Sequence, residues 1–467
     1  MKKINIFTIV LFASITLISC AGGRDYYEAM KAPEEKFYNG EYKEAARMLL
    51  PDVNKGGKDQ LLFMMECGLM LHTAGDFETS NKVLLPAGKL AQLIPISITK
   101  EAASFLTNDR NSNYRGEDFE KVLVHVYLGI NFLMMEKYEE ARVEFLAVNN
   151  ELSKIKSENG EARYKQNIMA KYLTAITFEI VGEMNKDEKD IEFAYIEYKQ
   201  IHQLDPDLDM VKDDLLRLSR KLGYDDDYAD WRSKFGKGYN ESENNGELIT
   251  IFQAGRSAVK QSRGSLLKDP AMEPIIRVTI NTGNLTAGVT VAAVLITLKN
   301  AENPIPKFVK RSNKVTRVRV TAGGESVNTV KLEDIENTAV KNLEDDYGRL
   351  YKRVAVSIAT KAVASIAAGI AAKKIAEQSK QLGQFAGLIG TAVGAGTGAA
   401  LFSQMKPDLR CWHTLPANFQ LGRMSIRPGK YKAKFSLSGG GGNIDQIEKE
   451  VEIKKGQKTL VNLRTLY

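Results

Sequence analysis

Cysteine, histidine and tryptophan are scarce in this chain of 467 residues, which has three, four and two of them respectively. No two cysteines form a C-x-x-C pair, and no cysteine or histidine has a neighbour at zinc-ligand spacing. A P-loop, a G-x-S-x-G motif and an H-E-x-x-H motif are missing as well. We therefore expect no metal, no cofactor and no enzyme activity, although an acidic site dispersed along the sequence would leave no such motif.

The chain has only a small excess of positive charge. The chain carries 65 basic and 58 acidic residues, which gives a formal net charge of +7. Spread over a large surface, this excess favours contact with anionic lipid or polymer only weakly and does not predict nucleic-acid binding. A hydrophobic content of 43% and a charged content of 26% are ordinary for a folded protein.

The N-terminus has the pattern of a lipoprotein signal peptide. Two lysines precede an uncharged, mostly apolar run at 4–18, which is too short and too early for an ordinary spanning helix of roughly 20 residues. The run ends in the lipobox-like L-I-S-C, whose last thiol, Cys20, would receive the lipid. We predict a signal peptide at 1–19 and, since no Asp follows Cys20, a periplasm-facing position on the outer membrane.

A repeated helical pattern occupies residues 20–240. Each repeat has an apolar helix, a short turn with Gly or a charge, and then an aromatic residue, usually followed by an Ala. The repeats start at Phe37, Gly68, Tyr127 and Tyr172. The small residues expected where helices cross are Ala45, Ala141 and Ala194. The pattern resembles tetratricopeptide (TPR) helix-turn-helix units at irregular spacing, so we predict a TPR-like α-helical solenoid.

Such a stack forms a concave groove, for which two interpretations remain open. The groove could hold a protein or peptide partner, or it could be filled by the chain itself.

One stretch of this half stands apart: Y-R-G-E-D-F-E-K-V, which begins at Tyr114. Glu117 and Asp118 would open a helix, where acids complement the positive end of the helix dipole, and Phe119 would face the core. Glu117 and Glu120 lie one turn apart and could pair for acid–base catalysis. The alternative interpretation is helix capping and solvated charge.

The pattern changes after a polar, glycine-rich linker at 236–246. Strand-like alternation is found at 247–253, 275–281, 289–298, 314–320, 430–437, 449–453 and 459–464. Helical character returns from about 332 to 402. We predict an α+β multidomain chain whose part at 241–467 is a β-sandwich-like domain, interrupted by a Gly/Ala-rich helical hairpin.

The predicted hairpin contains a glycine stripe. Residues 381–405 carry no charge. Within them, glycines recur every three or four residues at Gly383, Gly387, Gly390, Gly394 and Gly398. All five would lie on one face of a helix and let another helix approach closely, and the nearest candidate is the Ala-rich stretch at 353–372. We expect a packed hairpin that does not span a membrane, with an inserted hairpin as the alternative.

The segment after the hairpin reads D-L-R-C-W-H-T-L-P. Asp408 and Arg410 could pair, and Trp412 would anchor the exit of the hairpin against the sheet. The segment ends at Pro416. A carbohydrate or partner platform built on Trp412 and His413 is the alternative interpretation.

Four motifs carry a family resemblance. They are Y-R-G-E-D-F-E-K-V at 114–122, G-E-L-I at 246–249, Ile305-Pro306, and D-x-R-x-W-x-x-L-P at 408–416. With these motifs the chain resembles a bacterial family of uncharacterised outer-membrane lipoproteins, often encoded near a lipoprotein activator of penicillin-binding proteins. The resemblance implies a role in cell-wall or envelope maintenance and no settled activity.

The sequence thus predicts a protein-interaction scaffold that is held at a membrane by its lipid. A protein or peptide would bind the helical half, and the chain could form a homo-oligomer. Two alternatives remain. One is a homo-oligomer that inserts in or remodels a membrane through the glycine-striped hairpin, and the other is a cell-wall enzyme with a dispersed acidic site.

Overall fold

The computed structural model describes residues 25–93, 112–154, 167–239, 244–274, 276, 298, 301–379 and 382–467. The signal peptide and Cys20 lie outside the described residues. So do almost all of the strands expected at 275–281 and 289–298. Of these two ranges only Ile276 and Leu298 are described, and both are helical.

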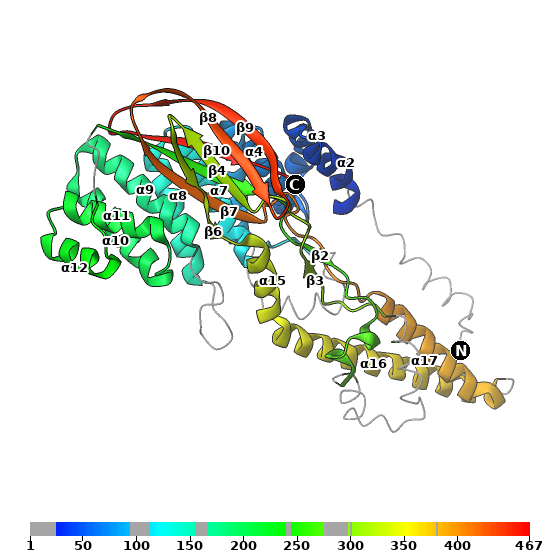
Figure 1. Cartoon of the computed structure of the whole chain (residues 1–467). Coiled ribbons are helices and arrows are strands. Elements are labelled where there is room, and N and C mark those ends of the chain that lie inside the picture. The colour runs from blue at the N-terminus through cyan, green and yellow to red at the C-terminus, as the bar shows by residue number, and fades with distance from the viewer. Residues whose placement is uncertain are drawn as a thin grey trace.

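The N-terminal half is helical, and the C-terminal region contains the sheets, which confirms the coarse division expected from the sequence. The helices of the first half are α2 (Tyr26–Tyr38), α3 (Tyr42–Lys55), α4 (Gln60–Thr73), α5 (Phe77–Leu93), α7 (Asp118–Met134), α8 (Tyr138–Lys154), α9 (Ile168–Asn185), α10 (Glu188–Leu204), α11 (Asp209–Lys221) and α12 (Asp225–Phe235). Each packs against the next one in the chain (Figure 1). Ala45, Ala141 and Ala194 are fully buried, as close helix crossings require.

Two four-stranded sheets follow. The first, in the order β10-β1-β7-β6, consists of β10 (Lys458–Arg464), β1 (Gly246–Ala254), β7 (Asn418–Ile426) and β6 (Val330–Glu333). The second, in the order β5-β4-β8-β9, consists of β5 (Glu325–Asn328), β4 (Arg317–Ala322), β8 (Gly429–Gly439) and β9 (Gly442–Ile453). A two-stranded ribbon pairs β2 (Val259–Gln261) with β3 (Lys307–Val309). Within the first sheet β10 runs parallel to β1, and β7 runs antiparallel to β1.

Strand β1 has apolar residues on both of its faces. Leu248 and Phe252 pack in a cluster with residues of the second sheet, whereas Ile249 and Ile251 belong to the main core together with the helices. Because side chains alternate along a strand, the first sheet lies between the helical stack and the second sheet.

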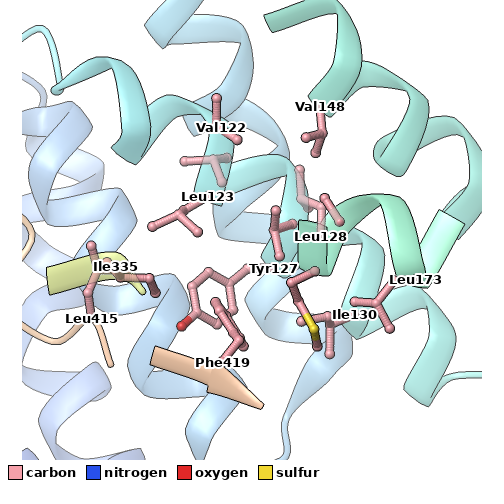
Figure 2. Packing of buried hydrophobic residues seen from close by; sticks show 14 of the residues in the cluster. Val122, Leu123, Tyr127, Leu128, Ile130, Val148, Leu173, Ile335, Leu415 and Phe419 are labelled. Carbon is pink, nitrogen blue, oxygen red and sulfur yellow. The ribbon is translucent and has the colours of Figure 1, made fainter. Parts of the chain in front are cut away.

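The first sheet covers the inner helices of the stack. Most residues of α4, α7 and α9 are buried. Figure 2 shows the ring of Tyr127 on α7 beside Phe419 of β7, with Leu415 and Ile335 nearby, and the two rings lie 5.7 Å apart. Of the two interpretations of the groove, the structure therefore supports the one in which the chain itself fills it.

The helical insertion contains α15 (Ile335–Asp345), α16 (Tyr347–Glu377), a short 3₁₀ turn, η4 (Gly383–Phe385), and α17 (Ala386–Ser403). Helices α16 and α17 lie side by side and project from the body (Figure 1). A cluster that includes Val354 and Phe402 holds their base against Leu266 and Met272.

The glycine stripe is shorter than the five residues expected. Gly390 and Gly394 face Gly369 of α16 so closely that an added Cβ on Gly390 would lie 2.8 Å from the Gly369 oxygen, and Gly398 is buried on the same face. Gly383 lies in η4, before α17 begins. Gly387 is exposed, with open space where its Cβ would be. The contact face therefore starts at Gly390.

Two glycine substitutions test the packing. A Cβ at Gly129 would lie 2.5 Å from the ring of Phe145, whereas at Gly348 it would meet nothing within 4 Å. We expect Gly129→Ala to lower the free energy of unfolding by about 1–3 kcal/mol through overpacking. Gly348→Ala, the matched control, should raise it by up to about 1 kcal/mol through helix propensity. Urea denaturation measures both, and an unchanged midpoint for Gly129→Ala would contradict the packing of α7 on α8 described above.

Candidate functional site at the junction of the two halves

A cleft of about 190 Å³ opens where the helical half, strand β2 and the base of the hairpin meet. Its wall includes Tyr114 and Glu117 from the first motif, Pro306 from the third, and Asp408 and Arg410 from the last. Side chains from the hairpin base complete it: Leu343, Asp346, Arg349, Leu350 and Arg353. Three of the four motifs, far apart in the sequence, thus share one cavity.

Arg410 is a buried residue of the cleft lining. Its guanidinium donates to both oxygens of Asp408, at 2.7–3.1 Å, and to Asp59 at 2.6 Å. A further bond of 3.1 Å reaches the carbonyl of Ser112. The Arg410 side chain is only 3% exposed, so these bonds fix its position.

Lys260 on β2 forms a second buried ion pair, with Glu117. Burial disfavours the charged form of Lys260, but the carboxylates of Glu117 and Asp408 outweigh it and raise the pKa of the lysine. Lys260 is thus held charged at the edge of the cleft.

The loop that carries Tyr114 and Glu117 is shaped by Gly116 and Glu120. Gly116 has a φ of +73°, a conformation that favours glycine. The turn lets the carboxylate of Glu120 accept hydrogen bonds from the Tyr114 hydroxyl at 2.5 Å and from the Glu117 amide at 2.8 Å. Glu120 is fully buried, so it positions the loop and does not face the cleft as half of an acid–base pair.

Asp118 and Phe119 lie outside the cleft. Asp118 is the first residue of α7, and Phe119 is buried, with its ring 6.2 Å from that of Phe308.

Two buried glutamates of the helical half hold the backbone of the segment after Arg410. Glu120 accepts a 2.7 Å bond from the Trp412 amide. Glu66 accepts from the amides of His413 and Thr414, at 2.6 and 3.2 Å, and from the Thr414 hydroxyl at 2.6 Å. Sequence reasoning missed Glu66, Asp59 and Lys260. A lone acid within the otherwise apolar helix α4 was the one available signal for Glu66.

Trp412 is not a surface platform. It is 1% exposed, and its ring lies 5.6 Å from that of Tyr127. His413 is turned to Glu34, 3.3 Å away. Pro416 is buried just before β7. The alternative of a carbohydrate platform on Trp412 and His413 is therefore wrong for Trp412, because burial between the helices and the sheet leaves no face of its ring open.

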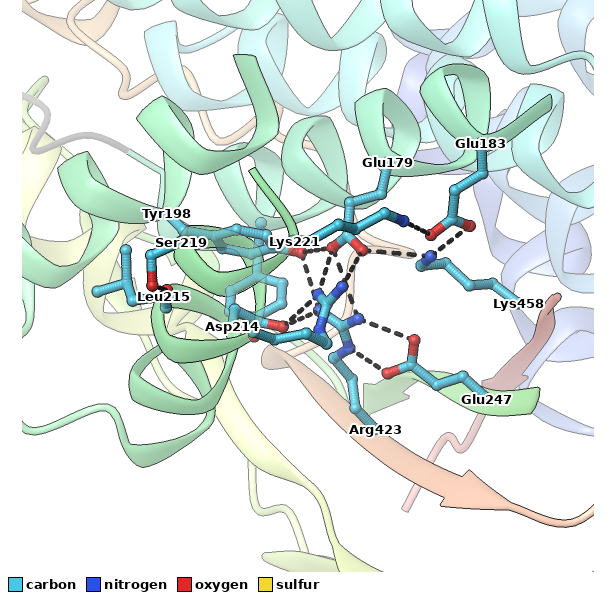
Figure 3. A network of polar contacts seen from close by, with 12 residues as sticks. Glu179, Glu183, Tyr198, Asp214, Leu215, Ser219, Lys221, Glu247, Arg423 and Lys458 are labelled. Carbon is cyan, nitrogen blue, oxygen red and sulfur yellow. Dashed lines mark hydrogen bonds and ion pairs between the residues drawn. The ribbon is translucent and has the colours of Figure 1, made fainter. Parts of the chain in front are cut away.

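A second charged network joins the two halves away from the cleft (Figure 3). Arg423 of β7 pairs with Glu247 of β1 at 2.5 Å and with Asp214 of α11 at 2.8 Å. Arg217 pairs with Glu179 of α9 at 2.7 Å, and Lys458 of β10 with the same Glu179 at 3.2 Å. These cations and acids neutralise one another at the seam, so the network serves the docking of the sheet.

No family model and no curated protein matches the sequence. Among solved structures, a MamA double mutant has 15% identity and a TM-score of 0.32, with 46% of this chain and 94% of that chain covered. MamA from Desulfovibrio magneticus has 15% identity and a TM-score of 0.31, with the same coverage. Superposition at this level supports no conclusion about function.

The buried Glu120 predicts a pH dependence of stability. Burial and the charge of Glu117 raise the pKa of Glu120 to about 7. The folded state therefore keeps a proton that the unfolded state releases, and the stability from this group falls as the pH rises from the ordinary glutamate value to about 7. When the pH is raised from 5.5 to 8, the free energy of unfolding of Glu120→Gln should fall by about 2 kcal/mol less than that of the wild type.

Urea denaturation at the two pH values measures this difference, with the exposed Glu28→Gln as the control. Equal losses in Glu120→Gln and in the wild type would contradict the raised pKa.

Proposed function

We propose that this protein is a lipid-anchored interaction protein of the bacterial envelope, which faces the periplasm from the outer membrane and binds a partner in the junction cleft. The lipobox at Cys20 supports the anchor, and the resemblance of the four motifs to those of outer-membrane lipoproteins supports the location. The helical half would contribute to binding through the loop at 112–117, because its inner helices are covered by the sheet.

The observation that carries the proposal is the set of fixed charges at an open cleft. Ion pairs of buried cations are often no more stabilising than well-packed apolar residues, yet the buried Arg410 and Lys260 are both held in ion pairs at the cleft wall. Rigid polar groups supported by buried partners are what a recognition site requires.

The charge of the lining suggests the chemistry of the partner. The cationic side chains are Arg115, Lys260, Arg349, Arg353 and Arg410, and the acidic ones are Glu117, Asp346 and Asp408. With more cations than acids, the cleft favours a partner surface that carries carboxylate or phosphate groups.

We propose binding rather than catalysis. The three acids of the lining each form an ion pair with a cation, namely Lys260, Arg349 or Arg410. The hydrogen bond and charge of Arg410 hold the pKa of Asp408 below its usual value despite burial, which makes Asp408 a poor proton donor. Neither histidine nor cysteine is among the described residues that line the cleft. Purified protein that cleaves peptidoglycan would contradict this view and favour a cell-wall enzyme.

The lipid anchor is tested by the mass of the mature N-terminus. We expect a wild-type N-terminal peptide that begins at Cys20 and carries the mass of the lipid, because the thiol is the acylation site. Cys20→Ser should lack this mass. A wild-type peptide with an unmodified Cys20, or one that begins elsewhere, would contradict the anchor.

The cleft is tested by co-purification. The tagged, lipidated protein is isolated from crosslinked envelopes, and its partners are identified by mass spectrometry. Reversal of charge in Arg115→Glu/Arg353→Glu should reduce recovery of the partner about tenfold or more. The double variant Arg317→Glu/Arg319→Glu makes the same charge change at exposed positions of β4 and should retain the partner.

Circular dichroism confirms that both variants are folded. Equal recovery by the two variants would exclude the cleft, and the absence of any wild-type partner would contradict the interaction role.

A further inference from the structure

The projecting hairpin packs glycines against one another at the contact between its two helices and exposes large apolar residues on its outer surfaces. Gly369, Gly390 and Gly394 form the contact between the helices. The outer surfaces carry Val356, Val363, Ile375, Phe385, Leu388 and Val393, each exposed by 40–71%. A surface helix of a water-soluble domain has its polar residues on the outer side. This hairpin has the reverse arrangement.

The dimensions of the hairpin match a bilayer. By length and composition, Tyr347–Glu377 and Gly383–Ser403 are each long and apolar enough to cross one. The 18 residues of α17 correspond to about 27 Å at 1.5 Å per residue, close to the hydrocarbon thickness of about 30 Å.

Charges within the hairpin are placed where a bilayer tolerates them. Lys361, the only charged residue between Val354 and Ala372, is 4% exposed and shares the packed face of α16 with Gly369. Lys373 and Lys374 stand near the tip, and Lys373 forms an exposed pair with Glu377. Basic residues at such a position suit anionic headgroups. The outer surface is thus left uncharged along most of its length.

We propose that the α16–α17 hairpin inserts into a lipid bilayer. Lipid fits this surface better than a second copy of the chain does. Close association of helices in membranes uses small residues, and the glycine stripe is already occupied within the hairpin. The exposed residues mix large apolar side chains such as Leu388 with small ones such as Gly387 and Ala392. They lie on both helices, so they form no single face for a protein. Acyl chains require only that the surface be apolar.

The inference is independent of the proposed cleft partner and of the lipid on Cys20. The test therefore uses the full mature chain in two forms, the acylated protein and the unacylated Cys20→Ser protein. Each form carries an environment-sensitive fluorophore on Leu388→Cys, at the outer surface of α17, or on the control Ser233→Cys, an exposed residue of α12. The native Cys67 and Cys411 are buried. The probe membrane is a vesicle of phosphatidylethanolamine and phosphatidylglycerol.

We expect the fluorophore at 388 to shift to the blue on mixing with vesicles and to be quenched by brominated acyl chains, in both forms of the protein. The fluorophore at 233 should do neither. An aqueous spectrum at 388 in the presence of vesicles would overturn the proposal. A shift without vesicles that grows with protein concentration would also overturn it, because a second copy would then cover the face.

A polar substitution gives a second measurement. Leu388→Asp/Val393→Asp should weaken vesicle binding of the unacylated protein by about tenfold or more, since charges inside the bilayer are costly. Both positions are exposed, so the fold should persist. Val143→Asp/Phe193→Asp places the same charges at exposed apolar residues of α8 and α10 and should bind vesicles as the parent does. Equal binding by both double variants would overturn the proposal.

Discussion

The helical stack has an apolar inner face that must be kept from water, and the chain's own first sheet covers it. Tyr127 packs on Phe419 and donates to Gln253 of β1 at 3.1 Å. The charged seam around Arg423 fixes how the sheet sits on α9 and α11. If the sheet left the helices, apolar surface would be exposed to water. If one member of the charged seam were removed, the opposite charge would stay buried without a partner. The helical half and the sheet are therefore parts of one body rather than two domains on a linker.

This arrangement determines where function can lie. A TPR-like stack normally offers its inner face to a peptide, but here that face is occupied. What remains is the junction cleft and the projecting hairpin, and the two are connected. Arg349 and Arg353 of α16 line the cleft, and the same helix continues into the hairpin. A partner in the cleft and lipid around the hairpin would thus contact opposite ends of one helix, close to the membrane at which the proposed lipid on Cys20 would hold the chain.

Much of the secondary structure could be predicted from the local pattern of apolar and polar residues. The helical periodicity, the strands at β1, β8 and β10, and the paired helices of the insertion all follow from residue spacing. Strand β7 was not predicted, because its sequence N-F-Q-L-G-R-M-S-I lacks clean alternation and depends on pairing with β1. The motifs at 114–122 and 408–416 could be recognised in the sequence, but their contact in the folded chain could not be predicted. That contact depends on Glu66, Asp59 and Lys260, whose partners lie between 143 and 351 residues away.

The central claim, that the helical stack and the sheet form one cooperative unit, can be measured with the two tryptophans of the chain. In Trp231→Phe, the fluorescence of the buried Trp412 reports on the junction, and circular dichroism at the helical band reports on the stack. The two signals should change at the same urea concentration. If most of the helical signal is lost at one urea concentration and Trp412 becomes exposed at another, the halves fold separately. That result would contradict the account.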